Sequence, residues 1–138
     1  MIVALLIGRA GSKGLPGKNV RKVLGKRLFE YPLIACKKSK YVKDIFISTD
    51  CKIIKKYSKK YKVNFINRPK KLASSKALGD HVFEHGYFKI KKLLKKQNKK
   101  IKYIVLLFAN APTINYKLID RGIEILNKNK NFDSAVST

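Results

Sequence analysis

Apolar positions along the chain fall into short continuous runs separated by longer amphipathic segments. The runs Ile2–Ile7 and Tyr103–Leu107 are wholly apolar, which is typical of strands buried on both faces of a sheet. We expect further strands at Asp44–Ser48 and Val63–Ile66, and the start of another at Ser134–Thr138. Apolar spacing and end signals predict helices at Leu28–Lys38, Lys52–Lys60, Gly79–Lys96 and Asn115–Asn127. Asp50 is expected to be the N-cap of the second of these helices.

Strands that alternate with helices predict an α/β fold, in which a parallel sheet carries helices on both faces. In such sheets, ligands bind outside the carboxyl ends of the strands. The segments at those ends are expected to converge on one crevice, and they are Gly8–Lys18, Thr49–Asp50, Arg68–Pro69 and Phe108–Pro112.

The first of these segments lies in the stretch LLIGRAGSKGLPGKNV, in which four glycines recur at every third position from Gly8 to Gly17. It is not a Walker A motif, because Gly17-Lys18 is followed by Asn19 rather than by serine or threonine. It is not the dinucleotide fingerprint either, because Gly8 and Gly11 are three positions apart. Glycines allow backbone N–H groups to turn towards an anion, and the cations of the loop favour a nucleoside triphosphate.

Composition limits the remaining classes. The chain has 138 residues, enough for one domain, and 45% of them are hydrophobic, as in globular proteins. No apolar run approaches the roughly 20 residues of a membrane span, and no secretion signal precedes the first strand, so we expect a cytoplasmic protein without membrane contact. Cys36 and Cys51 lack metal-ligand spacing and are predicted to be packing residues. His81 and His85 lack a third ligand, which favours a structural role.

The formal net charge of +25 comes mainly from lysine, with 28 lysines against 5 arginines. Proteins that read nucleic acid favour arginine, and here the lysines occur in every segment instead of in one cluster. Solvated lysine-rich faces are therefore the favoured explanation, and a surface for RNA or another polyanion stays open as the alternative.

The loop GRAGSKGLPGKN resembles the signature loop of the cytidylyltransferases that activate 2-keto sugar acids, namely the CMP-N-acylneuraminate synthetases and their CMP-3-deoxy-manno-octulosonate relatives. The stretches ISTD (47–50), NRPKKLASS (67–75) and LLFANAP (106–112) resemble further family segments in the same order. The resemblance spans nearly the whole chain and implies a Rossmann-like nucleotidyltransferase fold.

The resemblance also implies a role for each matching residue. Arg9 and Lys18 would grip the triphosphate of CTP and offset the charge on departing pyrophosphate, with Lys13 as a further cation. Ser12 and Asn19 would hydrogen-bond to phosphate or ribose, beside the backbone of Gly11. Arg68, aimed by Pro69, would lie against the cytosine, although a surface ion pair is the alternative for this arginine. Asn110 would contact the nucleotide or the sugar.

The implied reaction transfers CMP from CTP to a sugar acid, with Mg²⁺ as cofactor and pyrophosphate as the second product. Family aspartates that bind metal correspond to positions beyond Thr138, as do most sugar-binding and dimerisation segments. Residues 1–138 are therefore expected to form the nucleotide-binding part of one domain, and a full-length member is expected to be a homodimer. Phe108-Ala109-Asn110 departs from the usual glutamine-containing loop, which leaves the acceptor open. Another nucleotide or sugar, and a catalytically incomplete fragment, also stay open.

Overall fold

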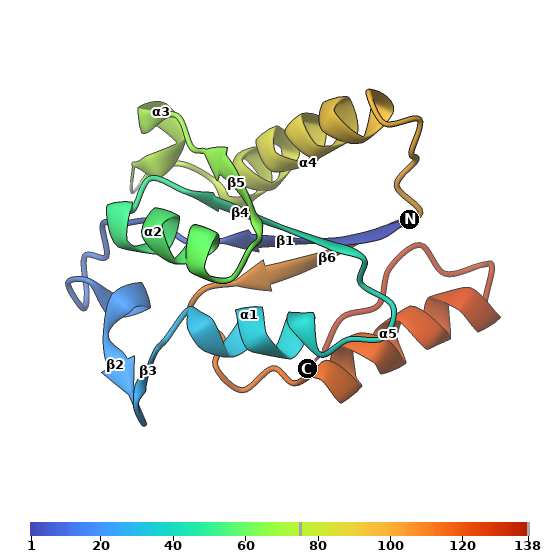
Figure 1. Cartoon of the computed structure of the whole chain (residues 1–138), viewed down its shortest axis with the longest axis horizontal. Helices are drawn as coiled ribbons and strands as arrows, with labels where there is room; N and C mark the ends of the chain where they lie inside the picture. Colours follow the sequence, from blue (N-terminus) through green and yellow to red (C-terminus); the bar gives the residue numbers. More distant parts are fainter. Residues whose placement is uncertain (75, 138) are drawn as a thin grey trace.

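The computed structural model describes residues 1–74 and 76–137 and contains a four-stranded parallel sheet with the order β5-β4-β1-β6 (Figure 1). Its strands are β1 (Ile2–Ile7), β4 (Asp44–Thr49), β5 (Asn64–Asn67) and β6 (Tyr103–Phe108). In the register of the sheet, Ile7 lies opposite Ser48 on one side and Phe108 on the other. The carboxyl ends of the three longest strands therefore finish level, at one edge of the sheet.

Helices cover both faces of this sheet. In Figure 1, α4 (Gly79–Lys95) lies above the strands, and α1 (Glu30–Lys37) and α5 (Tyr116–Lys128) lie below them. The two cores follow the alternation of side chains along β1. Ala4 and Leu6 belong to the core shared with α1, α5 and α2 (Lys52–Lys60), whereas Val3 and Leu5 belong to the core shared with α4. The α/β fold predicted from the sequence, with helices on both faces of a parallel sheet, is confirmed.

Several predicted elements match the structure to within two residues at each end. Pro32 is the third residue of α1, in the first turn, where its missing N–H removes no helical hydrogen bond. Asn115 is the N-cap of α5 and accepts a hydrogen bond from the N–H of Leu118 at 3.1 Å. Cys36 and Cys51 are both buried, as expected for packing residues.

Four short elements were not predicted. A 3₁₀ helix, η1 (Lys18–Val20), follows the glycine loop, and the strands β2 (Lys22–Val23) and β3 (Lys26–Arg27) form a small antiparallel hairpin after it. A single helical turn, α3 (Lys70–Ala73), follows β5. The hairpin strands are too short to show an alternating pattern in sequence.

The strand expected at Ser134–Thr138 is wrong for residues 134–137, which form no strand; Thr138 lies outside the described residues. A strand needs a neighbour to satisfy its backbone groups, and this segment does not meet the sheet. It runs back along α5 instead (Figure 1), where Ala135 Cβ lies 3.8 Å from the position that a Cβ on Gly122 would occupy.

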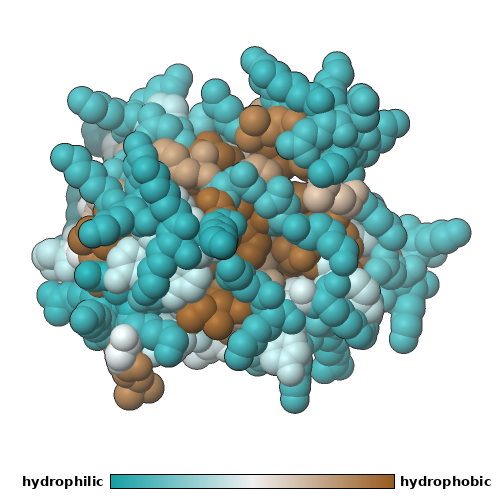
Figure 2. Space-filling model, in the orientation of Figure 1, coloured by the Kyte–Doolittle hydropathy of each residue, from teal (hydrophilic) through white to brown (hydrophobic). Residues whose placement is uncertain are grey.

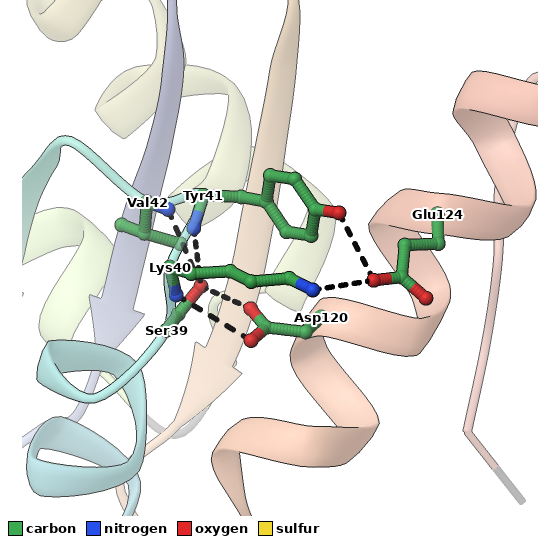
Figure 3. Close-up of polar contacts among 6 residues, drawn as sticks. All are labelled: Ser39, Lys40, Tyr41, Val42, Asp120 and Glu124. Carbon is green, nitrogen blue, oxygen red and sulfur yellow. Dashed lines mark hydrogen bonds and ion pairs between the residues drawn. The ribbon is translucent and has the colours of Figure 1, made fainter.

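A polar cluster fixes α5 against the segment that follows α1 (Figure 3). The buried Asp120 accepts a hydrogen bond from the hydroxyl of Ser39, whose oxygen in turn accepts the N–H groups of Tyr41 and Val42 at 3.2 Å. One turn along α5, Glu124 accepts a hydrogen bond from the Tyr41 hydroxyl at 2.9 Å. These contacts fix residues 39–42, which lead into β4, against α5.

Hydrophilic side chains project outwards around the face seen in Figure 2, with apolar side chains between them. They do not gather in one patch on this face. Among the helices of residues 1–74 and 76–137, none is both long and apolar enough to cross a bilayer.

Candidate functional site

The level carboxyl ends of the strands border a cleft of about 560 Å³. Its walls come from the glycine loop after β1, the ends of β5 and β6, and the segment from α3 into the first turns of α4. The lining residues are Ile7, Gly8, Arg9, Ser12, Lys13, Gly14, Leu15, Lys18, Asn19, Arg68, Leu72, Ser74, Ala77, Gly79, Val82, Phe108 and Asn110. The predicted convergence is confirmed for three of the four segments, whereas Thr49 and Asp50 do not line the cleft.

Seven of the eight candidate residues border this cleft. They are Arg9, Ser12, Lys13, Lys18, Asn19, Arg68 and Asn110. The eighth, Gly11, is exposed and does not line it, and a Cβ built on Gly11 would meet nothing within 4 Å. The geometry brings the candidates together; their individual roles stay predictions.

The shape of the glycine loop depends on two of its glycines in particular. A Cβ on Gly8 would lie 2.6 Å from Ala109 Cβ, so this position allows β1 and the loop after β6 to approach closely. Gly17 has φ +65°, in the left-handed region, and precedes η1, which carries Lys18 and Asn19. The loop is closed by Asn19, which is 8% exposed and donates a hydrogen bond from Nδ2 to the carbonyl of Arg9 at 3.0 Å.

The end of β4 holds both the loop and the end of β5. The carbonyl of Ser48 accepts the N–H of Gly8 at 3.2 Å and the Arg68 guanidinium at 2.7 Å. Asp50 Oδ1 accepts the N–H of Ala10 at 2.8 Å. The prediction that Asp50 caps α2 is wrong, because Cys51 is the N-cap residue and no side chain caps that helix. Instead, the carboxylate accepts a hydrogen bond from the N–H of Ala10, forty residues earlier in the chain.

Arg68 is the buried cation of the cleft. It is 6% exposed, and its own N–H donates to the carbonyl of Thr49 at 3.3 Å. Its Nε has no hydrogen-bond partner within residues 1–74 and 76–137. Burial lowers the pKa of Arg68, and the charge of Arg9 lowers it further, whereas Asp50 opposes both. The alternative of a surface ion pair is wrong, since the residue is buried and the ion pair found among the described residues is Lys40–Glu124.

Two further buried polar atoms lack a partner among the described residues, and both belong to residues near Arg68. They are Ser48 Oγ, on the strand that holds the guanidinium, and His85 Nδ1 on α4. Burial is the main cause that lowers the pKa of His85, followed by the charges of Lys89, Arg68 and Lys71. The neutral imidazole is therefore favoured, as suits a side chain placed among cations.

Charge in the cleft has one sign, because four lining residues are cations and none is a carboxylate. The cations Arg9, Lys13, Lys18 and Arg68 make the cleft complementary to a compact polyanion. Among the described residues, no group of three or more His, Cys, Asp or Glu side chains is placed to hold a metal ion. The donor set of the cleft thus suits an anion, and it does not suit a hard cation that prefers carboxylate oxygens.

Sequence reasoning missed the wall opposite the loop. Leu72, Ala77, Gly79 and Val82 give it an apolar lining with the start of α4 at one end. The position of Gly79 at the start of a predicted helix was the available signal. This signal predicts a helix but does not predict which of its residues line the cleft.

The fold and this cleft define a parallel α/β domain with a cationic cleft at the carboxyl ends of its strands. A family model described as cytidylyltransferase matches residues 3–138. The chain therefore belongs to the cytidylyltransferase family, and the resemblance noted in the sequence is confirmed.

Two curated proteins match nearly the whole of this chain. It is 33% identical over 138 residues to the post-translational flagellin modification protein B of Campylobacter coli, covering 98% of this chain and 57% of that protein. It is 28% identical to the bifunctional pseudaminic acid cytidylyltransferase and hydrolase of Helicobacter pylori, covering 95% of this chain and 24% of that protein.

A solved structure of CMP:2-keto-3-deoxy-manno-octonic acid synthetase complexed with CTP has a TM-score of 0.70 to this chain at 14% identity, and the match covers 95% of this chain and 49% of that one. At this identity the likeness shows the fold, which is the nucleotidyltransferase fold that the resemblance implied. The chain spans about half the length of that structure and 57% of the Campylobacter coli protein.

Proposed function

We propose that the cleft binds CTP, and that the protein takes part in the transfer of CMP to a 2-keto sugar acid. One observation carries this proposal: the cleft of a cytidylyltransferase-family chain is lined by four cations and by no carboxylate. A nucleoside triphosphate carries about four negative charges in a compact group, and a cleft of one sign attracts such a ligand.

The glycine loop is proposed to hold the triphosphate. Arg9, Lys13 and Lys18 provide positive charge along one wall of the cleft, and Ser12 and Asn19 provide hydrogen bonds to phosphate or ribose. Gly11 is proposed to contribute its backbone alone. The hydrogen bond from Asn19 to the carbonyl of Arg9 supports this proposal, because a loop that is closed beforehand loses less conformational freedom when the ligand binds.

Arg68 is proposed to recognise the base. Its buried Nε lacks a partner in the part of the chain that the structure describes. A buried donor without an acceptor is costly, and a carbonyl oxygen of a pyrimidine would satisfy it. Asn110, exposed at the mouth of the cleft, is proposed to contact the nucleotide or the acceptor.

In the proposed reaction, a hydroxyl oxygen of the sugar acid attacks the α-phosphorus of CTP. The new phosphorus–oxygen bond forms as the bond to the bridging oxygen of the β-phosphate breaks, and the hydroxyl proton passes to solvent. Pyrophosphate leaves with the bonding electrons, and Arg9 and Lys18 offset its growing charge. Mg²⁺ stays a prediction of the family resemblance. The residues lining the cleft offer it no carboxylate, so no step is assigned to the metal.

The acceptor, the assembly and the location are proposals at the level of the whole enzyme. The relatives are named for pseudaminic, N-acylneuraminic and N,N'-diacetyllegionaminic acid, so an acid of this class is the proposed acceptor. Residues 1–138 are proposed to supply the nucleotide-binding half of the site, in a homodimer when the enzyme is full length. CTP is a cytoplasmic metabolite, so we place the reaction there.

The test is direct calorimetric binding of CTP, ATP, GTP and UTP at about 0.15 M salt, where exposed charges are screened beyond about 8 Å. CTP is expected to bind most tightly, and Lys18→Ala is expected to weaken it at least tenfold. The matched control is Lys22→Ala, which removes an equal charge from the exposed strand β2 and should leave CTP binding unchanged.

Two outcomes would contradict the proposal. Equal binding of all four nucleotides that fades steeply with salt would indicate the surface charge of +25 as the cause, and would favour the polyanion alternative. Tighter binding of another nucleotide would keep the fold and change the substrate. Once CTP binding is established, release of pyrophosphate with each candidate sugar acid identifies the acceptor.

A further inference from the structure

No role has been assigned above to Asp50, although its side chain binds the backbone of the glycine loop beside the cleft. It follows β4 directly, and its Oδ1 accepts the N–H of Ala10 at 2.8 Å. Ala10 follows Arg9, the first cation of the cleft. The carboxylate therefore fixes the chain at the point where the loop leaves β1 and Arg9 turns towards the ligand.

At this end of the glycine loop, the N–H of Gly8 donates to Ser48 at 3.2 Å before the chain reaches Ala10. Ala10 and Gly11 are exposed, and the space around the Cβ positions of Gly11 and Gly14 is open for at least 4 Å. Besides the Ala10–Asp50 bond, the hydrogen bond from Asn19 to the Arg9 carbonyl restrains this segment. Without the carboxylate, a chain rich in glycine would sample many conformations before it met a ligand.

The same stretch of β4 holds the other end of the cleft. Ser48 and Thr49, the two residues before Asp50, accept the Arg68 guanidinium at 2.7 Å and the Arg68 backbone N–H at 3.3 Å. The loop end that carries Arg9 and the buried Arg68 are thus both anchored on three consecutive residues. The charge of Asp50 also raises the pKa of Arg68, in opposition to burial.

We propose that Asp50 is a positioning residue, which holds Ala10 by a hydrogen bond and so presets Arg9 and the glycine loop for the nucleotide. The inference rests on the proposed binding of CTP. It deepens that proposal by assigning the preorganisation of the loop to a residue outside the lining of the cleft.

Two substitutions separate the hydrogen bond from the charge. Asp50→Asn keeps an oxygen that can accept the Ala10 N–H and removes the charge, whereas Asp50→Ala removes both. Asp44→Ala is the matched control, because it deletes a carboxylate from the opposite end of the same strand. We expect the dissociation constant for CTP to rise at least fivefold in Asp50→Ala and to stay within threefold of wild type in the other two variants. Asp50→Ala is expected to melt near the wild-type temperature, because the carboxylate is exposed.

A second measurement needs no ligand. Amide hydrogen exchange by NMR should show Ala10 protected in wild type and Asp50→Asn, and unprotected in Asp50→Ala. If wild type does not bind CTP, the proposed function fails and this measurement alone decides the role of Asp50. Ala10 exchange that is equal in wild type and Asp50→Ala would overturn the inference. So would CTP binding by Asp50→Ala less than fivefold weaker than wild type, or an Asp50→Asn variant as weak as Asp50→Ala.

Discussion

Gly8→Ala is expected to destabilise the protein, because the structure has no space for one added methyl group. The new Cβ would lie 2.6 Å from Ala109 Cβ, closer than two such carbons approach in folded proteins, and 3.6 Å from Ile54 Cδ1. Ile54 can move, as its contact is the end of a flexible side chain. Ala109 cannot, because its Cβ is carried directly on the backbone.

The backbones on both sides are also fixed. The N–H of Gly8 donates to Ser48 at 3.2 Å, and the N–H of Ala109 donates to Ile7 at 3.0 Å. Relief of the contact therefore requires the ends of β1 and β6 to separate by several tenths of an ångström, with loss or lengthening of these bonds. Overpacking of this kind costs about 1–3 kcal/mol, and we expect the upper half of that range here.

Urea unfolding followed by far-ultraviolet circular dichroism measures the change in the free energy of unfolding. The control is Gly11→Ala, where the added methyl group meets nothing within 4 Å and the cost should be small. In the double variant with Gly8→Ala and Ala109→Gly, the contact is absent. Its loss in the free energy of unfolding should therefore be smaller, by about 1 kcal/mol or more, than the sum of the losses in the two single variants. A Gly8→Ala protein as stable as wild type, or strict additivity in the double variant, would refute this packing argument.

Three further outcomes are expected. Asp120→Ala should lower the free energy of unfolding by about 1–3 kcal/mol, because it leaves buried hydrogen-bonding groups without a partner. Lys40→Ala removes a 63% exposed partner of an ion pair and should lower it by under about 1 kcal/mol. Urea unfolding measures both changes. Cys36, whose pKa is raised to about 12 mainly by burial, should resist iodoacetamide at pH 8 in the folded protein and react in urea, as mass spectrometry would show. Burial and the hydrogen bond to Glu30 raise the pKa of Tyr61 to about 12. The contribution of Tyr61 to stability should therefore be complete below pH 10 and decline between about pH 10 and 12. The melting temperature of Tyr61→Phe should fall less than that of wild type over this range.

The central strand β1 could be predicted because all six of its residues are buried, and a strand buried on both faces is a continuous apolar run. The apolar run Tyr103–Leu107 likewise predicted β6, but the expectation that this strand is buried on both faces is wrong: β6 is at the edge of the sheet, and only Leu107 of its six residues is buried. Once these strands are taken as parallel, their carboxyl ends must meet at one edge. The meeting of the glycine loop, Arg68 and Asn110 at one cleft follows from that topology, without knowledge of a single contact.

The predictions for Asp50 and for residues 134–137 were wrong because local sequence suggests one interaction and the folded chain forms another with a distant segment. Asp50 precedes a helix, and the local pattern predicts a cap; the structure gives its carboxylate to Ala10. Residues 134–137 include Ala135 and Val136, which suit a strand, but they run beside α5 without a strand neighbour. Local sequence cannot rank such partners, since their energies differ by about the value of one hydrogen bond, on the order of 1 kcal/mol.

The positive charge spread over the whole protein and the positive charge of the cleft need different tests, because they respond differently to salt. Most lysines are exposed, so salt screens their charges, and they attract different anions without distinction. Arg68 is 6% exposed and is held in place by backbone carbonyls, so its charge acts at a fixed point from inside the protein. Salt weakens a charge of the second kind much less than one of the first. Substitution of Arg68 by methionine should accordingly reduce the difference in affinity between CTP and the other nucleotides, while the salt-sensitive part of binding remains.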